Sequence, residues 1–420
     1  MSLRIVKERV RPWYLRHIWF PAFPSRKPPC FDAAWQFPHL PLEGAGPLID
    51  AAREGGRDFL FLPMTDWHVR IQRPQFLARA LASLGHRCFF LNPHLGRQFQ
   101  RSSDASPQIA RIAPNIWELH VRLPLEPVFH HRPLREAESR ILADAVELLR
   151  RVAEVSRFVQ IAGFPVWRRL CELVRQSSGS PVVYDCHDLL SGFAGIDAAI
   201  VAEESALASE ADLVICSADR LRDHCLHIGA HPDRCVVIRN AVTATPEIQP
   251  RSPWATHVVG YVGALEDWFD VESVKTAARA LSDHRFLLAG RIESPKLQAL
   301  RGIPNVEFRG EIPGEDVPGF LAQIDAALIP FLLRDLTLAA DPIKLYEYLA
   351  AGLPVVSSRL PETARFADHI HFYDGPAGMA AAIRAAIDDR NDAARVRRRD
   401  SVRNETWTSR ARTLLDSLPC

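Results

Sequence analysis

The strongest constraint on the fold is an alternation, from about Asp58 onward, of short apolar runs with longer stretches of helical period. The apolar runs are rich in Val, Ile, Leu and Phe, which is typical of strands buried on both faces of a parallel sheet. Helices between such strands cover the two faces of the sheet. The sequence therefore predicts an α/β protein of doubly wound, Rossmann-like organisation.

The alternation occurs twice, which indicates two lobes, each with its own core. Between them, 243–256 contains three prolines and no apolar period, as expected of a linker. Strands are predicted at 59–63, 87–92, 158–162, 182–186, 213–217 and 235–239 in the first lobe, and at 258–263, 286–289, 306–308, 326–330, 354–357 and 369–372 in the second. Helices are predicted after Arg73 and over 135–155.

We divide the chain into five parts on this basis: an N-terminal extension (1–57), a first lobe (58–245), a linker (246–256), a second lobe (257–390) and a C-terminal helical segment (391–420). Ligands of doubly wound sheets bind beyond the carboxyl ends of the strands. We therefore expect the active site in the cleft between the lobes.

The overall charge excludes a dedicated nucleic-acid binder, because 51 Lys and Arg nearly balance 50 Asp and Glu. Residues 1–27 are an exception, with seven basic residues against Glu8 alone, interleaved with aromatic residues. This composition favours contact with an anionic membrane surface. An arm packed on the protein's own surface or on a partner is the alternative, and the prolines of this segment exclude one long amphipathic helix.

The eight cysteines are scattered and form no C-x-x-C motif. Cys88, Cys186 and Cys216 fall inside apolar runs, so we expect buried, reduced thiols of a cytosolic protein, with neither a disulfide framework nor a zinc site. No apolar run approaches the roughly 20 residues that span a bilayer.

The segment from Asp341 to Pro354 has the order expected of a helix that leads into a buried strand. Asp341 is predicted to cap the helix, and Gly352 to end it. Lys344 lies in the first turn at the electropositive N-terminus, which suits a diphosphate, and Glu347 could accept hydrogen bonds from sugar hydroxyls. A capped core helix in which Lys344 and Glu347 form an ion pair explains the same spacing.

Two further groups are candidates in the first lobe. His187 and Asp188 end a predicted strand, from which they could address an acceptor hydroxyl or the transferred sugar, although a hydrogen-bonded loop histidine is the plainer interpretation. Before the first predicted helix lie an aromatic side chain and three polar ones that suit a sugar or lipid diphosphate acceptor: Trp67, Arg70, Gln72 and Arg73. A helix-entry loop with Trp67 as a packing contact is the alternative.

The 341–354 segment resembles the donor-site helix of glycosyltransferase family 4 (group 1), retaining nucleotide-sugar enzymes of the GT-B fold. The resemblance extends to stretches at 66–75, 184–188, 240–242, 263–270 and 305–310 and covers about residues 58 to 418. The set is similar to the branch that includes teichuronic-acid-type polysaccharide glycosyltransferases. The resemblance implies that the first lobe binds the acceptor, that the second binds the nucleotide-sugar, and that the C-terminal helix returns to the first lobe.

It also implies roles for particular residues. Glu347 would bind the nucleotide ribose. Because the sequence contains neither an Asp-x-Asp pair nor a histidine cluster, we expect no metal ion, with helix dipoles and cations in its role. The remaining donor-site candidates are the Gly263 turn, Arg291 and Lys344 as cations for the diphosphate, and Thr337 and Asp341 as second-tier contacts to the sugar. Two positions depart from the family pattern, because Ala339 replaces a glutamate and Ala264 replaces a basic residue.

The resemblance leads us to expect transfer of a sugar from a UDP- or GDP-linked donor to a polysaccharide or glycolipid precursor, in the cytoplasm or peripherally at the inner membrane face. A nucleotide-sugar epimerase or sugar phosphorylase on the same fold is one alternative. A non-catalytic scaffold protein, suggested by Ala264 and Ala339, is the other.

Overall fold

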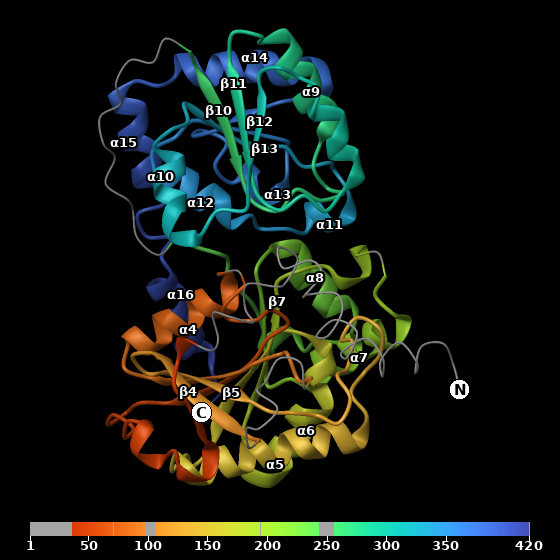
Figure 1. The fold of residues 1–420 in the computed structure, drawn as a ribbon, viewed down its shortest axis with the longest axis vertical. Helices are drawn as coiled ribbons and strands as arrows, with labels where there is room; N and C mark the ends of the chain where they lie inside the picture. Colours follow the sequence, from red (N-terminus) through yellow and green to blue (C-terminus); the bar gives the residue numbers. More distant parts are fainter. Residues whose placement is uncertain (1–35, 70, 97–105, 194, 243–255, 420) are drawn as a thin grey trace. The chain divides into compact units, whose positions relative to one another are not determined.

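The computed structural model describes residues 36–69, 71–96, 106–193, 195–242 and 256–419. The chain divides into two compact units, Met1–Ile238 with Ala411–Cys420, and Arg239–Arg410 (Figure 1). The chain returns to the first unit between Arg410 and Ala411, inside the last helix, α16 (Trp407–Ser417). The basic N-terminal segment 1–27, Arg70 and most of the predicted linker lie outside the described residues.

The first unit is built on a nine-stranded sheet with the order β1-β4-β5-β3-β2-β6-β7-β8-β9. Its strands are β1 (His39–Pro41), β2 (Asp58–Leu62), β3 (Arg87–Leu91), β4 (Gln108–Ala113), β5 (Ile116–His120), β6 (Phe158–Ala162), β7 (Val182–Cys186), β8 (Leu213–Cys216) and β9 (Cys235–Val237). Neighbouring strands pair in parallel except around β4, which is antiparallel to both β1 and β5. The helices are α4 (Arg73–Ser83), α5 (Glu136–Val152), α6 (Arg168–Ser178), α7 (Ala198–Glu210) and α8 (Asp219–His227).

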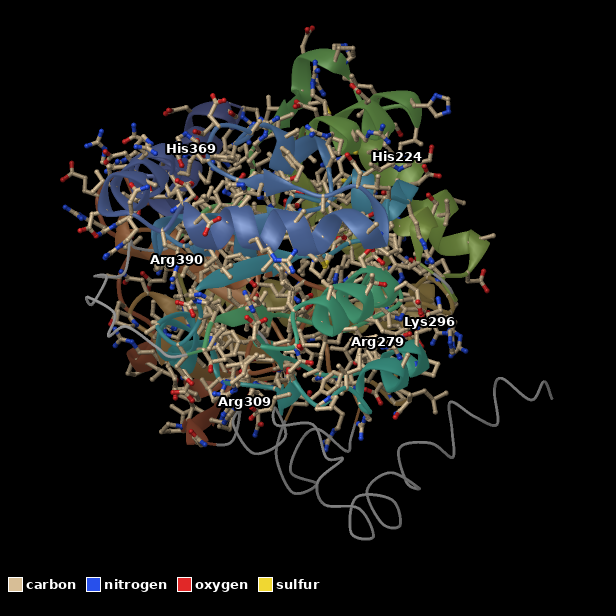
Figure 2. The ribbon with its side chains drawn as sticks, turned by 90° about the horizontal axis from the view of Figure 1, so that it is seen from above. His224, Arg279, Lys296, Arg309, His369 and Arg390 are labelled. Carbon is tan, nitrogen blue, oxygen red and sulfur yellow. The ribbon has the colours of Figure 1, made fainter. Side chains whose placement is uncertain are left out.

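The second unit is built on a parallel six-stranded sheet with the order β12-β11-β10-β13-β14-β15. Its strands are β10 (Val258–Val262), β11 (Arg285–Ala289), β12 (Val306–Gly310), β13 (Ala326–Ile329), β14 (Val355–Ser357) and β15 (His371–Phe372). The helices are α9 (Val271–Ala280), α10 (Val317–Leu321), α11 (Asp335–Leu338), α12 (Ile343–Ala350), α13 (Pro361–Ala364), α14 (Gly375–Asp388) and α15 (Asp392–Ser401). Figure 2 shows α14 lying across this unit beside α9, which carries the labelled Arg279.

The predicted α/β class and the two Rossmann-like sheets are confirmed, and each predicted strand overlaps a strand of the structure. Strands β1, β4 and β5 were not predicted. Strand β5 is fully buried, but its sequence Ile-Trp-Glu-Leu-His places a glutamate and a histidine in the core, which obscures the apolar pattern. In the described part of the chain, no helix is both long enough and apolar enough to span a membrane.

Two glycines bring the turns after β10 and β11 into close approach. Gly263 and Gly290 both have a φ of +147°, a conformation that residues with a side chain rarely adopt. A Cβ atom on Gly290 would lie 1.8 Å from the carbonyl oxygen of Gly263, which no side-chain movement can relieve. These turns form the carboxyl edge of the second sheet, where its ligands are expected.

We expect the substitution Gly290→Ala to lower the free energy of unfolding by roughly 2 kcal/mol or more, because it adds both backbone strain and a backbone clash. Gly302→Ala is the matched control, since an added Cβ atom there meets nothing within 4 Å. Urea unfolding monitored by circular dichroism measures both variants. Equal stability of the two would contradict the clash.

Candidate functional site

Lys344 lies at the carboxyl edge of the second sheet, in the first turn of α12. Its ammonium nitrogen lies 5.0 Å from the ring centroid of Phe331 and 5.5 Å from that of Tyr261. A Cβ atom on Gly263 would lie 2.9 Å from Cε of Lys344, so the lysine runs directly across the glycine turn. Within the described residues, the ammonium forms no hydrogen bond and no ion pair. A cation is therefore held between two aromatic rings with its hydrogen-bonding capacity unused.

Burial lowers the pKa of Lys344 to about 8, and the negative charge of Glu347 opposes this shift. Burial likewise raises the pKa of Glu347, against the charge of Lys344. Neither side chain forms an ion pair in the described part of the chain, so the alternative of a paired core helix is not what the structure shows. Both charges are desolvated and available to a polar ligand.

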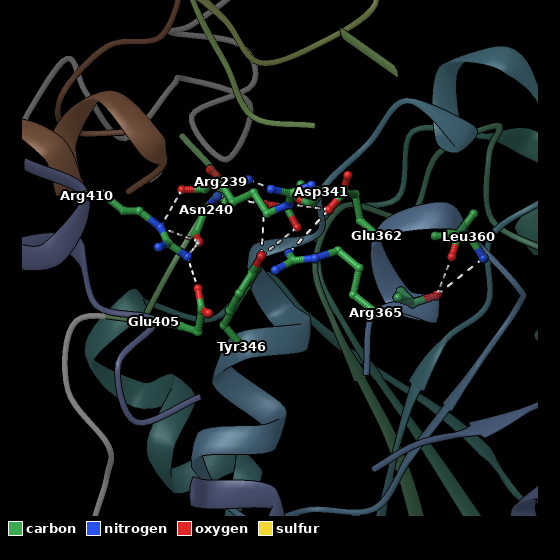
Figure 3. Close-up of polar contacts among 10 residues, drawn as sticks. Arg239, Asn240, Asp341, Tyr346, Leu360, Glu362, Arg365, Glu405 and Arg410 are labelled. Atoms are coloured by element: carbon green, nitrogen blue, oxygen red, sulfur yellow. Dashed lines mark hydrogen bonds and ion pairs between the residues drawn. The ribbon is translucent and has the colours of Figure 1, made fainter. Parts of the chain in front are cut away.

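The expectation that Asp341 caps the donor-site helix is wrong, because α12 begins at Ile343 with Pro342 as its N-cap residue. The Asp341 carboxylate instead accepts a hydrogen bond of 2.6 Å from the backbone N–H of Asn240, and one of 3.0 Å from the hydroxyl of Tyr346 (Figure 3). The side-chain amide of Asn240 donates in return to the backbone oxygen of Asp341 at 2.6 Å. Asp341 thus ties the start of α12 to the segment that follows β9.

A second set of polar contacts surrounds this link. The guanidinium of Arg410 donates to the backbone oxygen of Asn240 and to the carboxylate of Glu405 (Figure 3). Arg239 forms an ion pair of 2.8 Å with the buried Glu362. Burial, together with the negative charge of Glu362, raises the pKa of Asp341 to about 6.

The other donor-site candidates are engaged within their own loops. Arg291 is exposed and pairs with Glu293 at 2.8 Å. Thr337 is buried at the end of the short helix α11, where its hydroxyl accepts from the backbone N–H of Arg334 and donates to the backbone oxygen of Leu332. Of the six candidates, Lys344 and Glu347 alone carry charges that have no partner among the described residues, and the Gly263 backbone turn lies against Lys344.

In the first unit, His187 and Asp188 directly follow β7, as predicted. The imidazole Nδ1 of His187 lies 3.0 Å from the backbone oxygen of Asp185, and its Nε2 lies 3.9 Å from the Asp188 carboxylate. Burial raises the pKa of Asp188, against the charge of His187. The side chain of His187 keeps 17% of its exposure and that of Asp188 keeps 37%, so both reach solvent at the carboxyl end of β7.

The residues proposed to bind the acceptor mostly serve the architecture of their loop. Trp67 is buried, packs edge-on against Phe90 and lies beneath the guanidinium of Arg79. Arg73 is 2% exposed and forms an ion pair of 2.8 Å with Asp185 of β7. Gln72 caps α4 by exchanging hydrogen bonds with Gln75, and Arg70 lies outside the described residues. This geometry matches the alternative of a helix-entry loop with Trp67 as a packing contact.

A buried polar network holds that loop in place. The Glu118 carboxylate of β5 contacts Nε2 of His68 at 2.9 Å and Nε2 of His120 at 3.0 Å. The amide of Asn92 donates to both Glu118 and Asp66 at 2.8 Å. Burial alone would raise the pKa of Glu118, but the charges and hydrogen bonds of His120 and His68 outweigh it and hold the pKa below its usual range. The network explains how β5 buries a carboxylate.

Two groups among the described residues have ligand atoms close enough to hold a metal ion. One comprises His39, Glu118 and His120, and the other comprises Cys186, Cys216 and Cys225; in each, the ligand atoms lie within 4.8 Å of one another. Sequence spacing could not reveal either complete group, because His39 lies on β1 and its two partners on β5, and the three cysteines lie on β7, β8 and α8.

Sequence reasoning also missed residues that shape the donor edge. Tyr261 and Phe331 flank Lys344, Gly290 closes the neighbouring turn, and Tyr346 holds Asp341. One signal was present, since the predicted strand 258–263 ends in a glycine and another glycine follows the predicted strand 286–289. The aromatic residues carry no such signal, because aromatic side chains in apolar runs are usually core residues.

We expect Asp341 to make stability fall as pH rises from about 4 to about 6. Its pKa is higher in the folded state than its usual value of 3.8, so the folded protein binds more protons in this window, and stability decreases with pH. Between pH 4 and pH 6, the free energy of unfolding of wild type should fall by on the order of 3 kcal/mol relative to that of Asp341→Asn. Urea midpoints measured against pH test this, with Asp392→Asn, at a 93% exposed side chain, as the control. A pH-independent difference between wild type and Asp341→Asn would contradict it.

The comparisons with known proteins concern the family and the fold of the chain. Residues 256–389 match the family described as "Glycosyl transferases group 1". The chain is 27% identical over 279 residues to a Bacillus subtilis (strain 168) protein named as the teichuronic acid biosynthesis glycosyltransferase TuaH, covering 60% of this chain and 69% of that one.

Solved structures share the fold over most of the chain. Sucrose-phosphate synthase from Thermosynechococcus elongatus superposes with a TM-score of 0.65 at 15% identity, covering 86% of this chain and 98% of that one. Anabaena HepE in complex with UDP and glucose superposes with a TM-score of 0.58 at 15% identity and the same coverage. The predicted GT-B fold and the predicted family resemblance are confirmed, and the chain is a glycosyltransferase of the GT-B fold whose residues 256–389 match the group 1 family.

Proposed function

We propose that this glycosyltransferase transfers a sugar, with retention of anomeric configuration, from a UDP- or GDP-linked donor to a polysaccharide or glycolipid precursor. The observation that carries the donor half of this proposal is the unpartnered ammonium of Lys344 at the Gly263 turn. A diphosphate supplies the negative charge and the hydrogen-bond acceptors that this ammonium lacks. Backbone N–H groups of the first turn of α12 add to the attraction for an anion.

Glu347 would bind the ribose of the same nucleotide. It lies one turn after Lys344 on α12, so the two side chains share a face of the helix. A carboxylate without an intramolecular partner can accept hydrogen bonds from both hydroxyls of a ribose. The two residues together would therefore select a nucleoside diphosphate over inorganic phosphate.

The remaining candidates have secondary roles in this proposal. Arg291 would have to exchange Glu293 for a phosphate oxygen, and Thr337 and Asp341 would support the donor loop from beneath. His187 and Asp188 are proposed to address the acceptor hydroxyl or the transferred sugar from the end of β7. No metal ion is proposed at the diphosphate, where Lys344 and the helix N-terminus would stabilise the leaving charge.

The acceptor class rests on the similarity to TuaH, whose name refers to teichuronic acid biosynthesis. We propose that the acceptor is a related surface-polysaccharide or glycolipid precursor. The basic, aromatic segment 1–27 is proposed to contact an anionic membrane surface on the cytoplasmic side, where lipid-linked acceptors are presented.

Calorimetric titration with UDP and GDP tests the donor site. We expect one nucleotide to bind, and Lys344→Ala and Glu347→Ala each to weaken it at least about tenfold, because each removes a charged hydrogen-bonding group. Lys275→Ala and Glu272→Ala are matched controls, since these residues form an exposed ion pair on α9. Transfer from the matching donor should keep its anomeric configuration by NMR. Binding unchanged in both site variants, or isomerised donor without transfer, would refute the proposal.

The pH dependence of nucleotide binding tests the role of Lys344 separately. Its ammonium, with a pKa of about 8, loses its proton as pH rises, so affinity should fall above pH 8, by about tenfold at pH 9. In Lys344→Arg the cation persists, and the decline should disappear over this range. Wild-type affinity that stays constant from pH 7 to about pH 9 would show that Lys344 does not bind the diphosphate as a cation.

A further inference from the structure

Four cysteines that are far apart in the sequence converge in the core of the first unit, and we call them the thiol cluster: Cys186, Cys216, Cys225 and Cys235. Cys186 ends β7 and is the direct register partner of Cys216 at the end of β8. Cys235 pairs with Val214, two residues before Cys216, so both cysteines point to the same face of the sheet. Helix α8, which contacts β8 and β9, supplies Cys225.

Three of the four sulfur atoms have the spacing of a metal centre. The Sγ atoms of Cys186, Cys216 and Cys225 all lie within 4.8 Å of one another. The Sγ atoms of Cys216 and Cys235 lie 3.9 Å apart. Tetrahedral zinc with Zn–S bonds of about 2.3 Å requires S–S separations of about 3.8 Å. Cys235 does not belong to the group of three whose sulfur atoms all lie within 4.8 Å of one another, so its side chain would have to move closer to Cys186 and Cys225 to become the fourth ligand. All four side chains are at most 3% exposed.

We propose that the thiol cluster is a structural binding site for a thiophilic d10 cation, Zn²⁺, with Cys186, Cys216, Cys225 and Cys235 as its ligands. Binding would form four Zn–S bonds and release one proton from each thiol to solvent, with no change of oxidation state. Hard cations such as Mg²⁺ are excluded by the sulfur donor set.

The surroundings would reduce the charge penalty of a zinc tetrathiolate. The guanidinium of Arg222 on α8 donates to the backbone oxygen of Cys235 at 3.3 Å. His187 follows Cys186 directly in the chain, and its ring lies in the partly buried loop after β7. His224, labelled in Figure 2, neighbours Cys225 and lies 3.4 Å from the buried Glu204. One guanidinium, that of Arg222, therefore contacts the backbone of the cluster, and His187 and His224 are the chain neighbours of two of its cysteines.

A metal at this place would hold the loop that carries His187 and Asp188. The backbone N–H of Ser217, which follows Cys216, donates to the oxygen of Cys186 at 3.1 Å, and its hydroxyl donates to the oxygen of His187 at 3.2 Å. Zinc would fasten the ends of β7 and β8 directly beneath this loop. Its role would be to position the loop, with no contact to the reacting atoms.

Metal analysis of the purified full-length protein tests the proposal. After growth with zinc, wild type should contain about one Zn²⁺ per chain by mass spectrometry, and Co²⁺ replacement should give the intense sulfur-to-cobalt absorption of a tetrahedral thiolate site. Cys216→Ser should lose both the bound zinc and the sulfur-to-cobalt absorption. Cys171→Ser is the matched control, because Cys171 is equally buried, on α6, but lies outside the thiol cluster.

A second measurement on wild type covers the case in which Cys216→Ser fails to fold. Removing the metal with a chelator should lower the melting temperature, and adding Zn²⁺ should restore it. Titration of all eight thiols in denaturant should show no disulfide in the metal-loaded protein. Metal-free wild type whose melting temperature ignores added Zn²⁺, equal metal content in Cys216→Ser, or two missing thiols would overturn the proposal, whatever the outcome for nucleotide binding.

Discussion

The close approach of the turns after β10 and β11 is the constraint on which the candidate donor site depends. At Gly290 even one added carbon atom would clash with the backbone of Gly263. The two turns therefore carry no side chain at Gly263 and Gly290, and the Lys344 side chain lies against the Gly263 backbone between two aromatic rings. Burial lowers the pKa of Lys344 to about 8, because the ammonium is desolvated and no described residue pairs with it. A bound anion would stabilise this charge.

The helix that carries Lys344 is held by a separate set of contacts. Asp341 and Asn240 exchange hydrogen bonds, and Tyr346 reaches back from α12 to the same carboxylate. This arrangement separates support from binding: Asp341 is saturated by the protein itself, whereas Lys344 and Glu347 are not. A mutation at Asp341 should therefore act through the position of α12, and a mutation at Lys344 through ligand affinity.

In the first unit, too, the residues that support the structure differ from those that remain accessible to a ligand. Trp67 and Arg73 contribute to packing and to a buried ion pair, and the loop that bears them is fastened by the network around Glu118. His187 and Asp188 remain partly exposed at the end of β7, above the thiol cluster. Rigid elements thus position a small number of accessible polar groups, as is usual when loops at strand ends carry function.

The sequence by itself determined the α/β class, the two sheets and the glycosyltransferase resemblance, because buried parallel strands and helix caps leave local patterns of apolar residues, glycine and proline. It could not reveal β5, since the burial of Glu118 is stable only with His120 of the same strand and with His68 and Asn92, which come from distant segments. The separation of the Lys344 and Glu347 charges, the engagement of Asp341 by Asn240, and the convergence of four scattered cysteines were likewise decided by the tertiary structure. Each depends on side chains brought together by packing between elements, and such contacts have no fixed spacing along the chain.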